Sequence, residues 1–526
     1  MPRYLVGPIT HPLTPEHFQA ARDRGECLTF GSSSLADQVD IVVSSEMSWD
    51  EVVGAVPNGG SIDFLALWLP FADIPSKLWQ APVPIIGLAP RRYMHAHWYR
   101  RVLRHCDLAF SDASTATFLT KDGLAHVRPA ILCGLNPSFL IESTAETNRD
   151  VDLLFVGNLD RATHRERNRW IARLASSGRN VVVKSRVDFA EYRDLLSRAK
   201  IVFSYSAQGA CTARVFEAIA SGALLLEEAG NAEVKSILEP GIEYAVYDDH
   251  NLQDTIEHFL SHGDERTAMV NKARRRLAEF SFDALLGKAL ASVPMEWDLI
   301  QERCRQRTST AFAVDPVATA WSAGRSQGAA QELIELVTAH PENPELANAV
   351  GVYAPTAQEA ITWFQRALRA DPLHPLAGLN LVEGLVAVGQ PAEAAVQARE
   401  ALALLERGDG FRDEHVDSVH YPNSYDLFRV EWERSACQHA GDLAAEREAK
   451  RTLVRARLYA LSANLTNDLG HYAACAMARA DLPISQAALG CALARAQRYS
   501  EAIPCLRVAV EGDPFDRLAA QAIFRF

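Results

Sequence analysis

The sequence predicts two doubly wound α/β domains followed by an all-helical repeat domain. Three observations support this prediction. Short, nearly all-apolar runs alternate with helical stretches over about the first 300 residues. Beyond residue 310 the strand signals stop and alanine becomes more frequent, and a pattern with a 34-residue period appears there. We expect domains at 1–145, 146–310 and 311–526, which suits a chain of 526 residues.

Within the first domain, four apolar runs bounded by Pro, Gly or Asp are expected to be strands of a parallel sheet covered on both faces. They span 40–44, 63–68, 83–88 and 107–111. The stretch 93–105 reads as a helix between two of them, which implies a βαβ layout.

The second domain repeats this alternation. Strands are expected at 151–157, 180–183, 200–205 and 223–226, with helices at 164–176, 189–198 and 213–221. Residues 251–280 are expected to be helical, and 281–308 to form a helix broken near Pro294.

The third domain carries the repeat. Ala360, Ala367, Asp371 and Pro372 recur with the same spacing as Ala502, Ala509, Asp513 and Pro514, and Ala394 and Ala401 follow the first pair by 34 residues. Small residues where helices cross and a proline after the second helix are typical of tetratricopeptide repeats. Residues 405–425 depart from the period and are expected to form a loop insertion or a degenerate unit.

Composition excludes several classes. A formal net charge of -13 argues against a general nucleic-acid binder, whose affinity depends on phosphate neutralisation. The nine cysteines form no C-x-x-C pair, which disfavours a zinc site or a disulfide framework. No apolar run is long enough to span a bilayer, and the first residues lack the apolar core of a signal peptide. We expect a cytoplasmic protein.

The segment Cys211–Gly222 is the most informative for chemistry. Read as a helix, it can be capped by Thr212, and Arg214 and Glu217 share the stripe opposite its apolar face. A helix that begins past a strand's carboxyl end favours a phosphate there, so Arg214 could face a diphosphate and Glu217 the hydroxyls of a ribose. A solvated stripe with an ion pair between these two residues explains the same spacing.

Four stretches in this region carry a family resemblance: VDLLFVGN at 151–158, YRDLLSRAKIVFSYS at 192–206, ARVFEAIASGALLLEE at 213–228 and GIEYAVYDDHNLQDTI at 241–256. The chain from about 83 to 290 resembles group 1 glycosyltransferases of the spore maturation (CgeB-like) branch, which have the GT-B fold. The resemblance implies that Glu217 holds the nucleotide ribose. It also exposes a departure, because many group 1 enzymes carry a glutamate eight residues earlier, where this chain has Gly209. Backbone N–H groups of the loop around Gly209 could serve the donor instead.

The resemblance further implies that the loop after Gly157 lies beside the diphosphate. Gly157 would let the backbone approach, and Arg161 or Arg165 could pair with phosphate; Lys184 is a similar candidate at the end of the next strand. Each of these cations is also compatible with a solvated surface. In the first domain His95 or His97 could be the base for an acceptor hydroxyl, with His11 as another option.

The function expected from these features is sugar transfer from a nucleotide diphosphate sugar, without cofactor or metal, to an acceptor. The repeats would recruit a protein or glycan acceptor or a partner protein. The acidic pair Asp248–Asp249 is expected to be a solvated loop rather than a metal site. Two alternatives remain: a degenerate GT-B scaffold whose repeats mediate protein interaction, and a nucleotide-sugar epimerase of the same fold.

Overall fold

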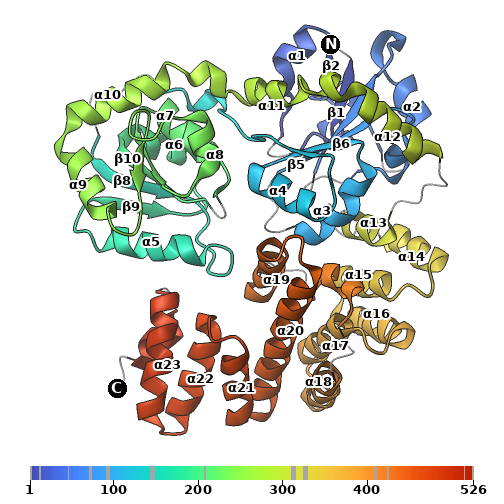
Figure 1. The fold of residues 1–526 in the computed structure, drawn as a ribbon, viewed down its shortest axis with the longest axis vertical. Helices are drawn as coiled ribbons and strands as arrows, with labels where there is room; N and C mark the ends of the chain where they lie inside the picture. The colour runs from blue at the N-terminus through green and yellow to red at the C-terminus, as the bar shows by residue number, and fades with distance from the viewer. Residues whose placement is uncertain are drawn as a thin grey trace. The chain divides into compact units, whose positions relative to one another are not determined.

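The computed structural model describes residues 3–10, 13–44, 47–69, 74–90, 95–141, 149–206, 209–309, 315–323, 330–407, 411–422, 426–514 and 516–523. The chain divides into two compact units (Figure 1). The α/β unit comprises Met1–Arg92, Leu103–Asp160 and Trp170–Phe312. The helical unit comprises Tyr93–Val102, Arg161–Arg169 and Ala313–Phe526.

The first sheet of the α/β unit has seven parallel strands in the order β3-β2-β1-β4-β5-β6-β7. Its strands are β1 (Tyr4–Gly7), β2 (Cys27–Gly31), β3 (Ile41–Val42), β4 (Phe64–Trp68), β5 (Ile85–Ala89), β6 (Leu108–Ser111) and β7 (Val127–Pro129). The four predicted strands are confirmed. The sequence reading missed β1, β2 and β7, because β2 and β7 contain polar residues and none of the three is a long apolar run. The flanking helices include α1 (Gln19–Asp23), α2 (Trp49–Gly54) and α4 (Ala113–Lys121).

The second sheet has five parallel strands in the order β12-β11-β10-β8-β9. Its strands are β8 (Val151–Val156), β9 (Val181–Lys184), β10 (Ala199–Ser204), β11 (Leu224–Glu228) and β12 (Ala245–Tyr247). Its helices are α5 (Arg165–Ala175), α6 (Phe189–Arg198), α7 (Ala213–Ala220), α8 (Ala232–Ile237), α9 (Leu252–Ser261) and α10 (Gly263–Arg274). The predicted strands and helices of this region are confirmed to within a few residues, and β12 is a fifth strand.

Right-handed crossovers decide which helix covers which face of this sheet. The step from β8 to β9 runs toward one edge, and every later step runs toward the other. Consequently α6, α7 and α8 bury their apolar residues in one core with Phe139 of the connecting segment. Apolar residues of α5 and α9, with Met269 and Val270 of α10, form a separate core on the opposite face. The second Rossmann-like sheet is therefore covered on both faces, as a doubly wound fold requires.

Residues after α10 return to the first sheet. The predicted break near Pro294 separates α11 (Phe282–Leu290) from α12 (Trp297–Ser309). Both helices bury apolar side chains in the core of the first sheet, among them Phe282, Leu286 and Ile300. Arg307 of α12 is 7% exposed and pairs with buried Asp107. Packing thus assigns 281–309 to the first domain, although the expected boundary at 310 placed this stretch in the second.

The helical unit consists of α3 (Ala96–Val102), which precedes β6 in sequence, and a series of later helices. These are α13 (Pro316–Ala323), α14 (Ala330–Ala339), α15 (Pro344–Tyr353), α16 (Ala357–Ala370), α17 (Pro375–Ala387), α18 (Pro391–Glu406), α19 (Leu427–Gln438), α20 (Leu443–Thr466), α21 (Leu469–Ala478), α22 (Pro483–Arg495), α23 (Tyr499–Gly512) and α24 (Arg517–Ile523). The small residues of the repeat pattern are buried: Ala360, Ala394 and Ala502 are each 0% exposed.

Residues 411–422, inside the expected insertion, are packed in the helical unit. The amide groups of Asn348 on α15 and Asn380 on α17 both donate to the carbonyl oxygen of Val419 at 3.0 Å. Both asparagines are 0% exposed, so the backbone at Val419 is held by buried side chains of the unit. None of the helices described here is long and apolar enough to cross a membrane.

Candidate functional site

The carboxyl end of the second sheet gathers polar side chains where its strand order reverses. The chain leaves β8 toward one side and β10 toward the other, which opens a crevice between the ends of these two strands. Gly157 follows β8, and the segment 205–212 leads from β10 into α7. The sequence-predicted residues Thr212, Arg214 and Glu217 all belong to this region.

Arg214 spans the crevice and is fixed by the end of β8. Its Nε and Nη2 atoms donate to the carbonyl oxygen of Val156 at 3.2 and 2.9 Å, and its guanidinium lies 4.7 Å from the centre of the Phe155 ring. A Cβ at Gly157 would lie 2.6 Å from Nη2, so this glycine makes room for the arginine. The expected reason for Gly157 was close approach to a ligand; the structure shows close approach to Arg214.

Three buried polar atoms near the start of α7 have no hydrogen-bond partner among the described residues. They are Ser206 Oγ, Thr212 Oγ1 and Arg214 Nη1. Thr212 is the N-cap of α7 with an extended backbone, as expected, but its hydroxyl accepts no capping bond, which corrects the predicted cap. Buried polar atoms are rarely left unpaired in native proteins. Two hydroxyls and one guanidinium N–H at a helix N-terminus can bind an anion.

Glu217 lies one turn further along α7 and is held by Tyr192 of α6. The Tyr192 hydroxyl donates to Glu217 Oε2 at 2.6 Å. Burial raises the pKa of the Glu217 carboxyl, while the bond from Tyr192 and the charge of Arg214 act to lower it. The alternative interpretation, an ion pair between Glu217 and Arg214 on a solvated stripe, is not what the structure shows: Arg214 contacts Val156, and Glu217 contacts Tyr192. Tyr192 was not singled out as a site residue, although it opens the stretch YRDLLSRAKIVFSYS.

Two further carboxylates lie at this edge: sequence reasoning placed Glu227 after a strand end without giving it a role in nucleotide binding, and it missed Glu233. Glu227, at the end of β11, is 0% exposed, and burial raises its pKa even though Ser204 and Asn231 lie beside it. Glu233 of α8 accepts backbone N–H bonds from Ala113 and Cys211, each at 2.6 Å. The sequence signal for these residues is weak: each is a charged residue that follows the apolar run Leu224–Leu226, Glu227 directly and Glu233 six residues later.

The sequence also named Gly209 and Lys184 as candidate site residues, and the structure shows a backbone constraint at the first and an ion pair at the second. Gly209 has a φ of 71°, in the left-handed region that favours glycine. A glutamate at this position would be strained, so the departure at residue 209 is built into the loop backbone. Lys184 pairs with Glu191 and is 46% exposed; a role in phosphate binding stays a prediction.

Arg161 and Arg165 belong to the helical unit together with the acidic residues that they contact. Arg161 pairs with Asp513 and Asp516, at 2.7 and 3.1 Å. Arg165 lies 3.9 Å from a carboxylate oxygen of Glu431. Both arginines therefore form ion pairs within the helical unit. Their expected role at the diphosphate stays a prediction.

His95 and His97, the candidate bases, are buried in the helical unit as well. Their exposed fractions are 1% and 3%. His97 forms a close pair with Glu433, and burial lowers the pKa of its imidazole. An acceptor base must reach solvent or substrate, and the structure provides neither for these side chains. Neither histidine gains support as the base, and His11 lies outside the described residues.

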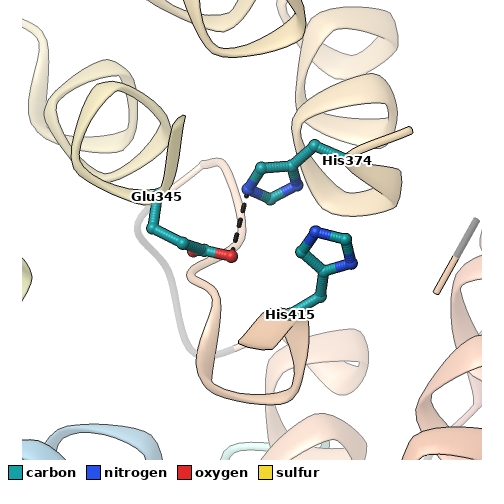
Figure 2. Close-up of side chains that lie close together, drawn as sticks. All are labelled: Glu345, His374 and His415. Atoms are coloured by element: carbon teal, nitrogen blue, oxygen red, sulfur yellow. Dashed lines mark ion pairs between the residues drawn. The ribbon is translucent and has the colours of Figure 1, made fainter. Parts of the chain in front are cut away.

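A second cluster, in the helical unit, has the composition of a metal site. Ligand atoms of Glu345, His374 and His415 lie within 4.8 Å of one another, and Figure 2 shows them converging. However, Nδ1 of His374 accepts the N–H of Ala377, and Nδ1 of His415 accepts the N–H of Arg412.

Each imidazole must then carry its proton on Nε2, which lies beside a carboxylate. Nε2 of His374 is 3.2 Å from Glu345, and Nε2 of His415 is 3.0 Å from Asp371. A protonated nitrogen is not a metal ligand. The hydrogen bonds therefore give this cluster a structural role in holding the insertion.

One protein-family model matches the part of the chain that contains the candidate site. A family model described as "Glycosyl transferase-like" matches residues 136–291, which include every residue of the crevice named above except Ala113. No curated protein matches the sequence.

Several solved structures are similar in part. HepE from Anabaena, in complex with UDP and glucose, has 11% identity and a TM-score of 0.38 over 56% of this chain and 100% of its own. A glycosyltransferase from Rickettsia africae has 12% identity and a TM-score of 0.39 over 57% and 98%. Sucrose-phosphate synthase from Thermosynechococcus elongatus has 11% identity and a TM-score of 0.38 over 56% and 99%. The crevice of the second sheet thus lies in the part of the chain that is similar to the glycosyl transferase-like family.

Proposed function

We propose that the protein transfers a sugar from a nucleotide diphosphate sugar to an acceptor. The observation that carries this proposal is Arg214. Its guanidinium is fixed by the end of β8, while Nη1 is buried without a partner among the described residues, as are the hydroxyls of Ser206 and Thr212 near the start of the same helix. A diphosphate would supply the missing acceptors.

In the transfer step, the bond from the sugar's anomeric carbon to the diphosphate breaks, and a bond from that carbon to the acceptor oxygen forms. The acceptor proton leaves to a base that we do not assign. Negative charge grows on the leaving diphosphate, and Arg214 together with the N-terminus of α7 stabilises that charge. Because Arg214 is already held by Val156, little reorganisation is needed during the reaction.

Glu217 would bind the ribose of the donor. Its carboxylate lies one helical turn from Arg214, and the hydrogen bond from Tyr192 fixes its orientation. A carboxylate oriented in this way can accept bonds from ribose hydroxyls through its remaining lone pairs. Phosphate and ribose are neighbouring groups in a nucleotide, and Arg214 and Glu217 lie on neighbouring turns of one helix, so one ligand can contact both.

We propose a hexosyl donor, a CgeB-like enzyme and a cytoplasmic location from the sequence resemblance and composition alone. We propose that the helical unit is of the tetratricopeptide type and recruits a protein or glycan acceptor. We also propose that no metal takes part. Asp248 already accepts two backbone N–H bonds, from His250 and Asn251, and Asp249 pairs with Arg173.

The alternative, a degenerate scaffold, is favoured by one observation: Gly209 stands where many group 1 enzymes carry a glutamate. Its left-handed backbone favours glycine at this position, and the absence of a carboxylate there leaves Arg214 and Glu217 in place.

Calorimetric titration of the full chain with nucleoside diphosphates, followed by an assay of donor hydrolysis, tests both functions. Binding with slow release of free sugar supports a transferase. Binding without any turnover, with or without cell-derived acceptors, supports the scaffold. No binding of any nucleoside diphosphate overturns the proposed site. Arg214→Ala should abolish binding, and Arg198→Ala, which removes an exposed arginine of α6, is the matched control.

A further inference from the structure

An exposed aromatic residue lies on the same helix as Tyr192, the residue that holds the proposed ribose carboxylate. Phe189, the first residue of α6, is 50% exposed. A single exposed apolar side chain is common and needs no explanation. Phe189 differs because it belongs to an aromatic cluster that leads to the candidate site.

The cluster is defined by two edge-to-face contacts centred on Phe139. Its ring centroid lies 5.2 Å from that of Phe189 and 5.5 Å from that of Tyr192. Phe139 is 7% exposed and belongs to the core beneath α6 and α7. The buried ring therefore supports Phe189 from one side and holds it in a fixed orientation, which lowers the entropy lost when a ligand binds.

The same cluster contacts Glu217, because the hydroxyl of Tyr192 donates a hydrogen bond to the Glu217 carboxylate. Phe189 and Tyr192 are three residues apart on α6, so they lie on one face of that helix. Both belong to its first turn, which follows the carboxyl end of β9 and thus lies at the ligand-binding edge of the sheet. The contacts thus lead from the anion site at Arg214 to the carboxylate of Glu217 one turn away, and from Glu217 through Tyr192 to the exposed ring of Phe189.

We propose that the Phe189 ring is the platform on which the nucleobase of the donor stacks. The inference rests on the proposed function, since it assigns the third part of the same ligand. In a nucleoside diphosphate the ribose separates the phosphates from the base, and the three groups on this edge follow that order. A flat aromatic face suits a base because every base presents a π-face, and stacking accepts purines and pyrimidines alike. Phe189 thus contributes affinity, and the choice among bases falls to other groups.

The experiment compares Phe189→Ala with wild type by calorimetric titration with ADP, GDP, UDP and CDP, and with inorganic pyrophosphate. For the nucleoside diphosphate that binds most tightly, Phe189→Ala should weaken binding about tenfold, equivalent to about 1.4 kcal/mol. Pyrophosphate, which has no base, should bind both proteins equally. Leu299→Ala is the matched control, because Leu299 of α12 is also 50% exposed and lies outside the cluster.

A second variant gives a direct signature of stacking. Phe189→Trp should keep the affinity and add an indole whose emission is quenched by the nucleotide and not by pyrophosphate. The protein has nine tryptophans of its own, so the signal is the difference from wild type. Unchanged nucleotide affinity in folded Phe189→Ala, or no added quenching in Phe189→Trp, overturns the platform while leaving the proposed function intact. Failure of every nucleoside diphosphate to bind wild type overturns both.

Discussion

Replacing Glu217 by glutamine is the sharpest test of how the crevice would hold a nucleotide. The side chain keeps its size, and its amide oxygen can still accept the bond that Tyr192 now donates to Glu217. Hydrogen bonds to charged groups contribute about 1.5–3 kcal/mol, so loss of the carboxylate should raise the dissociation constant of the nucleotide by roughly 10- to 150-fold. Stability should change little, because burial already disfavours the ionised carboxyl and raises its pKa.

The assay is calorimetric titration of wild type and Glu217→Gln with the same nucleoside diphosphate, with thermal melting to confirm folding. Adding Tyr192→Phe, alone and combined with Glu217→Gln, gives a double-mutant cycle that measures how far the two residues act together. If Tyr192 acts only by orienting Glu217, then Tyr192→Phe weakens binding in wild type and has little further effect in the Glu217→Gln background. A folded Glu217→Gln protein that binds nucleotide as tightly as wild type would refute the assignment of the ribose to this carboxylate.

Four other predictions address the site and its support. Gly157→Ala should displace Arg214 and weaken nucleotide binding in a protein that still melts cooperatively, because the new Cβ would lie 2.6 Å from Nη2; equal affinity would show that the guanidinium position is unimportant. Burial raises the folded-state pKa of Glu227, so its contribution to stability is present below the ordinary glutamate pKa and lost as the pH rises through the folded value. Glu227→Gln should therefore raise the melting temperature at pH 8 and leave it nearly unchanged near pH 4, and the reverse order would contradict this account. Transfer should survive EDTA, whereas a complete loss restored by manganese would place a metal in the mechanism. Glu433→Gln should destabilise the full chain by about 3–5 kcal/mol in denaturant unfolding, because it leaves Arg429 buried beside a neutral group; a change below 1 kcal/mol would be inconsistent with a buried pair.

The sequence alone determined the local elements of the second sheet and four of the seven strands of the first. Buried parallel strands are nearly continuous apolar runs, and β4, β5 and β8 could be read directly for that reason. The helix at 189–198 agrees with the prediction at both ends because Asp188 caps it and Ala199 begins the next strand. The stripe of α7 likewise placed Arg214 and Glu217 at the carboxyl edge of the sheet, because helix periodicity and position after a strand are local properties.

Only the tertiary structure decided which partners these residues have. Arg214 and Glu217 are adjacent on one helix, yet they are held by Val156 and Tyr192, which come from other parts of the chain. The helix that carries His97 reads as an ordinary βαβ crossover, yet the buried imidazole of His97 pairs with Glu433, 336 residues away. A sequence pattern records periodicity within one element and carries no record of which distant carboxylate neutralises a buried cation or imidazole. Those pairings arise from the free-energy cost of burying an unpaired charge, and that cost is decided only when the elements pack.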